Sequence, residues 1–479
     1  MAFRPNRFKP RSSWLLAMMI AAGGVAAPMS LPAHGAAAAA LEAAEADSVG
    51  EIVSSRLSEP DADPDLAEFY ASREGRPLWF QRGGKISPEA KQFIARLRNA
   101  AADGLDPAHY QPDELTEALR RARGDRDEQA AVEMMLSTAL ANWGADLHRA
   151  KPAAELLYSD AKFRSPEMSR REVLDRVATA PSLKAGIASV AQMNPIYMRL
   201  RAALAEEIAS DGPNVAVIRA NLERARALPT DLGRRYILVD IAAQRLWAYE
   251  DGEPVDGMKV VVGRPNAPTP GMAALIRFAV FRPYWNVPPD LIAKSVAPKV
   301  VKRGLGYFEA QNFEALSDWS DNAEHLDPAK VNWRAVAAGK KHVRVRQLPG
   351  PGNMMGQVKF MFPNELGVYL HDSPLRDLFG GDERLASAGC VRLEDATRLA
   401  KWLLNESVVA EGEEPGPPET RVDLPNPVPV YLVYFTAAPT SQGLSIRKDI
   451  YGRDPALIAQ LDGAPTASAS ADRPKLASR

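Results

Sequence analysis

The pattern of hydrophobic and polar residues changes about halfway along the chain. In the first half, apolar residues recur at intervals of three and four, which is typical of amphipathic helices. Ser87 followed by Pro88 predicts a helix that begins at residue 88, because serine caps helices well and proline fits their first turn. Residues 126–148 and 215–228 predict two more helices. We therefore expect a helical scaffold domain over residues 48–230, with little strand character.

The second half has the pattern of short strands. Runs of β-branched and aromatic residues are separated by turn residues, and few helices intervene. Asp251-Gly252 lies between two such runs and is a strong hairpin signal. The strands are expected over residues 236–241, 246–249, 258–262, 276–281, 359–362, 367–370 and 428–436. This predicts an α+β fold class, in which a β-rich domain of mixed-sheet or sandwich-like form spans residues 231–457.

A segment of about sixty residues, 290–350, interrupts the strand pattern. It carries many charges, short helical stretches, and Trp319 and Trp333. It is far longer than an ordinary loop. We expect a lid over a site or a small packed insertion, and the two are compatible.

Both ends of the chain have the composition of segments outside the folded domains. Residues 1–35 are typical of a signal peptide, with a basic start, an apolar run and small residues suited to cleavage. The apolar run is shorter than the roughly 20 residues of a spanning helix, so contact with a membrane is expected only if this segment stays uncleaved. Residues 36–47 are expected to be a flexible tether, and residues 458–479 a disordered tail. These features predict a protein that is exported from the cytoplasm.

Charge and composition exclude several classes of protein. Lys and Arg number 59 against 60 Asp and Glu, which leaves a formal net charge of -1. A nucleic-acid-binding protein would show a clustered basic excess, so no nucleic-acid partner is expected. The six histidines and one cysteine lack metal-ligand spacing. We expect neither a metal nor an organic cofactor.

The single cysteine, Cys390, is the most informative residue for chemistry. It cannot form an internal disulfide, so it is an intermolecular bridge, an inert buried residue or a nucleophile. A free thiol in an exported protein is a liability, which favours a functional role. His371 ends a predicted strand nineteen residues earlier, and its imidazole could accept the thiol proton. The alternative interpretation is that His371 has a structural role and only caps a loop.

The residues around Cys390 suit the same chemistry. Gly389 permits close approach, and nearby peptide N–H groups could bind an oxyanion. An amphipathic helix follows, and its dipole would favour a thiolate if Cys390 lay near its first turn. Arg392 offers a positive charge to a thiolate or to a substrate carboxylate. Alternatively, Asp372 and Arg392 form an ordinary ion pair, and Asp372 is expected to be structural rather than catalytic.

The stretches 369–374 and 387–393 resemble the active-site signature of the L,D-transpeptidases, bacterial cell-wall enzymes with a cysteine nucleophile. That signature has a histidine, a variable gap, then Ser, His or Ser, Gly, Cys, an aliphatic residue and Arg. The resemblance covers most of residues 65–455. It extends to Gly263-Arg264-Pro265 with Thr269-Pro270, Tyr284-Trp285-Asn286-Val287-Pro288, Asp449-Ile450-Tyr451-Gly452, Asn221-Leu222-Glu223-Arg224, and Pro77-Leu78-Trp79 with Asp103-Gly104-Leu105.

The resemblance implies roles for the residues of the signature. Cys390 would be the nucleophile and His371 its base and later acid. Gly389 would shape the oxyanion site or orient His371. The residues that it places in the substrate cleft are Tyr369, Arg392, Ser387 and Trp285. It also implies a lid-bearing catalytic domain, acylation by carbapenems, peptidoglycan stem peptides as substrates, and other cell-wall synthesis proteins as partners.

Two departures from the family pattern leave alternatives open. Position 388 is alanine where the family commonly has histidine or serine, and residues 196–215 leave no room for a separate peptidoglycan-binding module. The resemblance implies 3→3 cross-links made through a thioester on tetrapeptide stems. With water as acceptor, the same site would be an L,D-carboxypeptidase or a cross-link hydrolase. A decayed site would leave a non-catalytic wall-binding scaffold protein.

Overall fold

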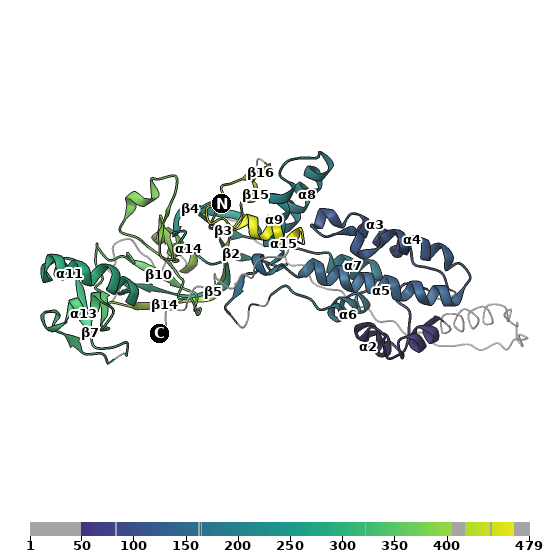
Figure 1. The fold of residues 1–479 in the computed structure, drawn as a ribbon, viewed down its shortest axis with the longest axis horizontal. Coiled ribbons are helices and arrows are strands. Elements are labelled where there is room, and N and C mark those ends of the chain that lie inside the picture. Colours follow the sequence, from purple (N-terminus) through teal and green to yellow (C-terminus); the bar gives the residue numbers. More distant parts are fainter. Residues whose placement is uncertain are drawn as a thin grey trace, which may run out of the picture.

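The computed structural model describes residues 49–81, 84–160, 163, 165–320, 322–404, 417–440 and 443–463. The molecule is elongated, with helices at one end, a sheet in the middle and a small insertion at the other end (Figure 1). The predicted signal peptide and tether lie outside the described residues. The described part contains no helix that is long and apolar enough to cross a membrane.

The helices of the first half begin and end where local signals place them. Asp125 accepts hydrogen bonds from the N–H groups of Asp127 and Glu128, which caps the 23-residue helix α5. The helices predicted from residue 88 and over residues 126–148 are confirmed. These helices are α2 (Pro64–Ser72), α3 (Pro88–Arg98), α4 (Pro112–Arg121), α5 (Arg126–His148), α6 (Arg170–Thr179), α7 (Leu183–Val190), α8 (Pro195–Ala209) and α9 (Val215–Arg226).

A buried carboxylate anchors the Pro77-Leu78-Trp79 stretch to helix α5. Glu133 is fully buried and accepts hydrogen bonds from the Tyr70 hydroxyl at 2.5 Å, the Leu78 N–H at 2.5 Å and the Trp79 N–H at 3.0 Å. Burial raises the pKa of this carboxyl group, and the three donors oppose that shift. This stretch therefore serves the packing of the scaffold.

The second half forms a mixed sheet whose strand pairings close on themselves. The order runs β5-β10-β11-β13-β4-β3-β2-β14, and β14 pairs again with β5. The hairpin at Asp251-Gly252 is confirmed, since both residues have positive φ, as a tight two-residue turn needs. The strands are β2 (Arg235–Asp240), β3 (Arg245–Glu250), β4 (Glu253–Gly263), β5 (Met272–Phe281), β10 (Val358–Met361), β11 (Leu370–His371), β12 (Leu385–Ser387), β13 (Val391–Leu393) and β14 (Thr420–Val433).

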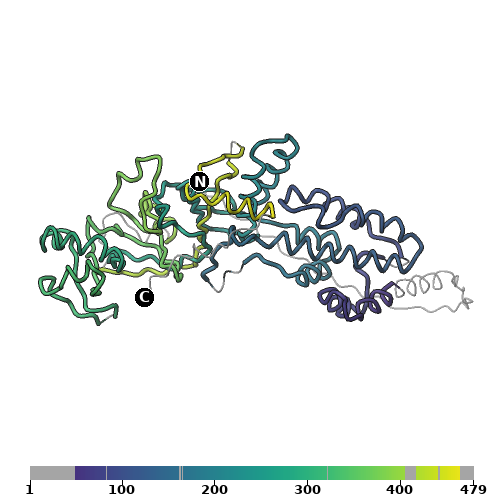
Figure 2. The backbone as a smooth tube through the Cα atoms, in the orientation of Figure 1, coloured from purple at the N-terminus to yellow at the C-terminus, as the bar shows by residue number. Residues whose placement is uncertain are grey.

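The helical half and the sheet share one hydrophobic core across the predicted boundary near residue 230. A short strand, β1 (Leu157–Tyr158), leaves the helical half and pairs in parallel with β5; Figure 2 follows the backbone in this region. Tyr431 and Ala273 of the sheet lie in the same hydrophobic core as the scaffold helices. Arg224 of α9 also forms a 2.6 Å ion pair with Asp454 beyond the last strand. Among the described residues before 230, β1 is the only named strand, and its two residues agree with the expectation of little strand character.

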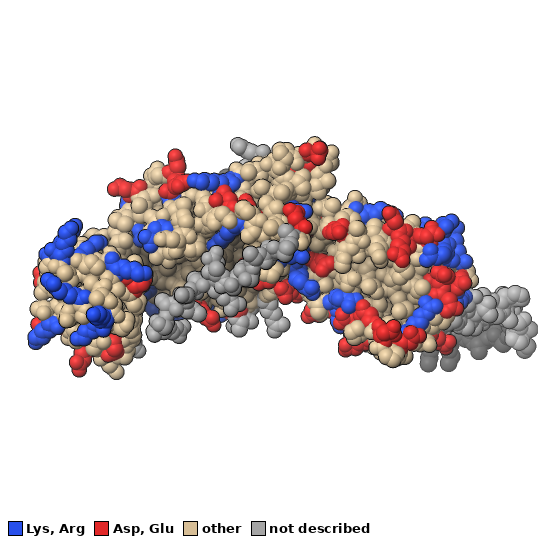
Figure 3. Space-filling view, viewed as in Figure 1, with Lys and Arg blue, Asp and Glu red and all other residues tan. Residues whose placement is uncertain are grey.

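The segment predicted as a lid or insertion is a packed unit with its own core. Phe308, Phe313, Trp333 and Val345 lie at its centre. Its outer surface is rich in Lys and Arg on the face that Figure 3 shows. Its elements are β6 (Trp285–Asn286), α10 (Pro289–Leu291), a π-helical turn (Ile292–Val296), α11 (Ala297–Arg303), α12 (Leu305–Ala310), β7 (Phe313–Leu316), β8 (His325–Leu326), α13 (Trp333–Ala337) and β9 (Arg344–Gln347).

The end of the fold lies beyond the predicted boundary. Helix α15 (Asp454–Leu461) contacts α9, and Leu457 is fully buried between them. The prediction of a disordered tail from residue 458 is therefore wrong for residues 458–461. The rest of that prediction, from residue 464 on, lies outside the described residues.

Candidate active site

Two neighbouring parallel strands carry the histidine and the cysteine. His371 of β11 pairs with Arg392 of β13, and the same register continued by one residue places Tyr369 beside Cys390. The hydrogen bond from Val391 N–H to the Tyr369 carbonyl, at 3.2 Å, agrees with this register. Side chains paired across parallel strands point to the same face, and alternate residues share it. All four side chains therefore lie on one face, with His371 diagonal to Cys390 at about 7 Å between Cβ atoms.

The opposite face of the same strands fixes this arrangement. Leu370, Val391 and Leu393 are fully buried in the sheet core. Helix α14 (Ala396–Leu404) covers that core with Leu399 and Leu403. A slip of one residue would move the apolar side chains to the polar face, so burial of the core sets the register of the site.

The hydrogen bond of His371 identifies its tautomer. Nδ1 lies 2.5 Å from the carbonyl oxygen of Asp372, which can only accept a hydrogen bond. Nδ1 therefore carries the proton, and Nε2 holds the free electron pair. Burial, together with the charges of Arg392 and Lys359, lowers the pKa of His371 to about 3. The imidazole is thus neutral near pH 7 and can act as a base through Nε2.

The thiol of Cys390 is half-buried and neutral in this state. Its Sγ donates to the Gly367 carbonyl oxygen at 3.7 Å. Burial raises its pKa, while Tyr369 and the charge of Arg392 oppose that shift. Strand β13 separates Cys390 from α14. The condition for the expected dipole effect, that Cys390 lies near the first turn of this helix, is therefore not met.

Hydrogen bonds within the loop hold the backbone of residues 387–390. The Ser387 hydroxyl donates to the Cys390 carbonyl at 2.5 Å and accepts from Gly389 N–H at 3.1 Å. Thr269 Oγ1 donates to the Gly389 carbonyl at 2.9 Å. Ser387 is buried, so it serves the loop rather than the substrate cleft. Gly389 does not orient His371, because the Asp372 carbonyl has that role.

Stretches far apart in the chain meet behind this loop. Gly263 N–H donates to Thr269 Oγ1 at 2.9 Å, and its carbonyl accepts from the Tyr451 hydroxyl at 2.6 Å. Thr269 N–H in turn donates to the Tyr451 hydroxyl at 3.3 Å. The family-like stretches around Gly263, Thr269 and Tyr451 thus support the loop that presents Cys390.

The backbone of Gly389 needs a residue without a side chain. Its φ is +118°, although an added Cβ would meet only the Pro268 carbonyl at 3.8 Å. We expect Gly389→Ala to lower the free energy of unfolding by about 1–3 kcal/mol through backbone strain, measured by denaturant titration. Gly380→Ala is the matched control, since Gly380 has φ of -75° and should change little. Equal effects of the two substitutions would contradict this account.

Two charged side chains complete the polar face. Lys359 pairs with His371 across β10 and β11, and its ammonium lies 3.2 Å from Glu419. The Nε of Arg392 is buried and has no hydrogen-bond partner among the described residues. Sequence reasoning missed Lys359, and it named Thr269 only as part of a family-like stretch, without a role in the site. The single polar residue between Val358 and Phe360 was the available signal for Lys359.

Two other predicted residues lie outside this group. Trp285 is in β6 and packs against Phe313 in the insertion, 6.4 Å between ring centres, so the structure does not bring it to Cys390. Asp372 is structural, as expected, but its ion pair at 2.8 Å is with Arg376 and not with Arg392. The Asp372 carboxylate also accepts from Gln357 N–H at 2.9 Å.

The chemistry available is that of a thiol and an imidazole. Within the described part of the chain, no three His, Cys, Asp or Glu side chains are grouped so that they could hold a metal ion. Ala388 is exposed beside the thiol and contributes no polar group to it. A neutral thiol and a neutral base on one face of adjacent strands, together with a guanidinium on the same face, are suited to covalent acyl transfer.

Comparisons with known proteins agree with this arrangement. Residues 64–204 match a model named Scaffold domain, and residues 234–424 match the L,D-transpeptidase catalytic domain. A Haemophilus influenzae protein named as a candidate L,D-transpeptidase is 28% identical over 400 residues, which is 82% of this chain and 78% of that protein.

Solved structures resemble only part of the chain. The L,D-transpeptidase from Mycobacterium smegmatis is 14% identical with a TM-score of 0.20, over 41% of this chain and 58% of that one. LdtMt1 in complex with imipenem is 13% identical with a TM-score of 0.20, over 42% and 59%. The match therefore spans less than two thirds of either solved chain.

Proposed function

Because this chain belongs to the L,D-transpeptidase family, we propose that it transfers acyl groups between peptidoglycan stem peptides through a thioester on Cys390. One observation carries the proposal: the half-buried thiol and a neutral imidazole share one face of adjacent parallel strands. L,D-transpeptidases act on peptidoglycan outside the cytoplasm. We place this protein in the periplasm, consistent with the signal-like residues 1–35.

In the first step, Cys390 Sγ attacks the carbonyl carbon of an L-to-D peptide bond in a tetrapeptide stem. His371 Nε2 accepts the thiol proton as the C–S bond forms, because its Nδ1 is already committed to the Asp372 carbonyl. The imidazolium then protonates the leaving nitrogen of the terminal D-alanine. The C–N bond breaks and the thioester remains on Cys390.

In the second step, an amine of another stem attacks the thioester carbonyl. The C–N bond forms, the C–S bond breaks, and the electron pair returns to sulfur. His371 relays the proton from the amine to the sulfur, which restores the neutral pair. The product would be a 3→3 cross-link. With water in place of the amine, the same steps give hydrolysis.

Arg392 and Tyr369 are the substrate-facing groups in this scheme. The unpartnered Nε of Arg392 suits the carboxylate of a stem peptide, since guanidinium binds carboxylates well. Tyr369 packs edge-on against His371 at 5.7 Å between ring centres, which limits rotation of the imidazole. The insertion would restrict access of water to the thioester.

The direct test is the intact mass of the protein after incubation with a carbapenem. Opening of the β-lactam ring by Cys390 adds the whole mass of the drug, so wild type should gain one adduct and Cys390→Ala none. Glu114→Gln, which alters an exposed residue of α4, should react as wild type does. Failure of wild type to form the adduct would contradict the proposal.

Product analysis separates transfer from hydrolysis. Muropeptides treated with wild type should give new dimers by mass spectrometry. Shortened monomers without dimers would identify a carboxypeptidase or hydrolase. If Cys390→Ala complemented a deletion strain fully, the protein would instead be a non-catalytic scaffold.

A further inference from the structure

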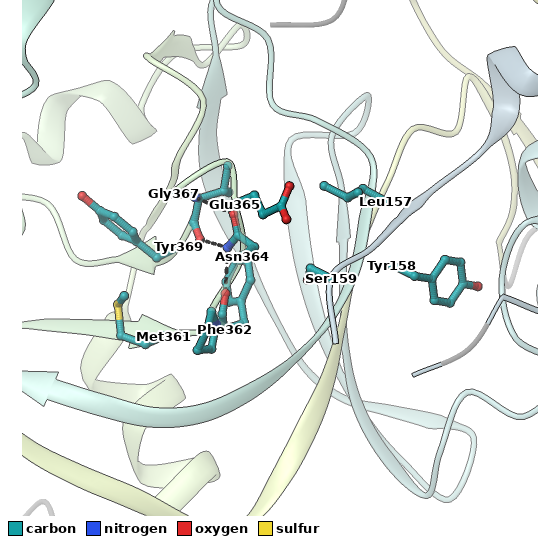
Figure 4. Close-up of a pocket in the computed structure, with 11 residues that line it drawn as sticks. Leu157, Tyr158, Ser159, Met361, Phe362, Asn364, Glu365, Gly367 and Tyr369 are labelled. Carbon is teal, nitrogen blue, oxygen red and sulfur yellow. Dashed lines mark hydrogen bonds between the residues drawn. The ribbon is translucent and has the colours of Figure 1, made fainter. Parts of the chain in front are cut away.

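A pocket of about 530 Å³ lies beside the active site, between the two halves of the chain. One wall is the strand β1 segment from the helical half, and the other is the loop joining β10 to β11 (Figure 4). The two walls are separate because β1 and β10 pair with different parts of β5, residues 272–273 and 278–281. The lining residues are Leu157, Tyr158, Ser159, Met361, Phe362, Pro363, Asn364, Glu365, Gly367, Val368 and Tyr369.

The loop that lines this pocket also touches the nucleophile. The Gly367 carbonyl accepts from Cys390 Sγ at 3.7 Å. Asn364 holds the loop in shape, since its Nδ2 donates to the Phe362 and Val368 carbonyls, both at 2.7 Å, and its Oδ1 accepts from Val368 N–H at 3.1 Å. Only this hydrogen-bonded loop would therefore separate a molecule in the pocket from a thioester on Cys390.

The pocket has one charged side chain, the carboxylate of Glu365. Glu365 points across the pocket toward Leu157 (Figure 4). It is exposed and has no ion-pair partner among the described residues. A single carboxylate on an otherwise uncharged lining favours a cation, and an ammonium group is the cation that a peptide carries.

The strand β1 offers backbone groups to an extended peptide. Leu157 N–H and Ser159 N–H donate to Gly271 and Ala273, both at 3.2 Å. By strand alternation, the N–H and C=O groups of Tyr158 point to the other edge. β1 is the last strand of the sheet order on that side. A peptide can add to such an edge as a further strand.

From these observations we propose that the pocket binds the acceptor of the second step: an extended peptide with a primary amine, held as ammonium by Glu365. This inference rests on the proposed function and names the site of its acceptor. The amine leaves Glu365 as the free base, having given its proton to water. Its lone pair then attacks the thioester carbon, the C–S bond breaks, and His371 passes the second nitrogen proton to the sulfur.

Binding to the full-length Cys390→Ser protein tests the pocket without any acylation. The probes are a tripeptide whose third residue carries a side-chain amine, and the same peptide acetylated on that amine. We expect Glu365→Gln to weaken calorimetric binding of the amine peptide about five-fold. Binding of the acetylated peptide should be equally weak with and without the substitution. Glu114→Gln should change neither.

A second variant tests the wall contributed by the helical half. Leu157 is 40% exposed, so Leu157→Lys should fold and place an ammonium opposite Glu365. This variant should also lose affinity for the amine peptide, whereas the uncharged Leu157→Gln should lose little. Unchanged binding of the amine peptide in both Glu365→Gln and Leu157→Lys would overturn the acceptor pocket.

Carbapenem acylation tests the proposed function separately from the acceptor pocket. Glu365→Gln should acquire the adduct at the wild-type rate, because the first step does not use the pocket. If wild type forms the adduct but Glu365→Gln does not weaken binding of the amine peptide, the acceptor pocket is contradicted and the proposed function is supported. If Glu365→Gln weakens binding of the amine peptide but wild type forms no adduct, the acceptor pocket is supported and the transferase function is contradicted.

Discussion

Replacing His371 with asparagine is expected to slow acylation of Cys390 by about a thousand-fold. Asparagine can keep the hydrogen bond to the Asp372 carbonyl, because its Nδ2 occupies a position close to that of Nδ1. It has no group in place of Nε2, so only the base is lost. The rate is measured from the time course of the carbapenem adduct by mass spectrometry.

The matched control for this substitution is His109→Asn. His109 is an exposed residue of the helical half, and its replacement should leave the acylation rate unchanged. Unfolding midpoints of both variants should be close to that of wild type. Acylation of His371→Asn within ten-fold of wild type would remove His371 from the mechanism.

The pH dependence of the same reaction reports the protonation state of the pair. The pKa of His371 is lowered to about 3, and that of Cys390 is raised. The pair therefore stays neutral well above pH 3 and through neutral pH, so the acylation rate should vary less than about two-fold from pH 5.5 to 8. A histidine base with the ordinary pKa near 6.5 would lose about ten-fold of its activity at pH 5.5. An inflection near pH 6.5 would contradict the assigned environment of His371.

Replacing Arg226 with leucine is expected to destabilise the protein by about 3–5 kcal/mol. Arg226 is fully buried, and its guanidinium donates to Glu223 Oε2 at 2.9 Å, to the Leu147 carbonyl at 2.9 Å and to the Asp103 carbonyl at 2.6 Å. Leucine would leave the Glu223 carboxylate buried without its cation and would remove one donor from each of the two carbonyls, of which the Asp103 carbonyl keeps the Tyr197 hydroxyl at 3.3 Å. Denaturant titration followed by circular dichroism measures the loss.

The control for the buried arginine is an exposed one. Arg234 is 85% exposed and pairs with Asp251 at the surface, so Arg234→Leu should cost less than about 1 kcal/mol. The double variant Arg226→Leu, Glu223→Leu should recover part of the stability, because it also removes the unpaired charge. A loss from Arg226→Leu no larger than that from Arg234→Leu would show that this cluster does not hold α9 in place.

Helix starts and tight turns could be predicted from a few neighbouring residues. Ser87-Pro88 predicted the start of α3, and Asp251-Gly252 predicted the hairpin between β3 and β4. These predictions held because a cap or a turn is stabilised within a few residues. The strand after Cys390 was missed, since the alternation of apolar and polar residues in β13 covers only three positions.

The chemistry of the candidate site could be predicted only as residue types. A lone thiol, a histidine and an arginine in a family-like pattern indicated a covalent mechanism. The sequence did not indicate that Ser387 would be used inside the loop, or that Trp285 would join the core of the insertion. It also missed Lys359, which reaches the site through pairing with His371. Each of these depends on partners far away in the chain.

The sequence by itself determined the α+β class, the family, and the identity of the thiol and imidazole, because these follow from local periodicity and from residue types at fixed positions. Only the tertiary structure decided that β11 and β13 pair in parallel, that His371 presents Nε2, and that β1 forms a wall of the pocket beside Glu365. The physical reason is that strand register is set by burial of side chains that are distant in sequence. A one-residue slip would turn Cys390 and Arg392 into the core and expose Val391 and Leu393, and it is the burial of these two side chains against distant parts of the sheet and α14 that prevents it.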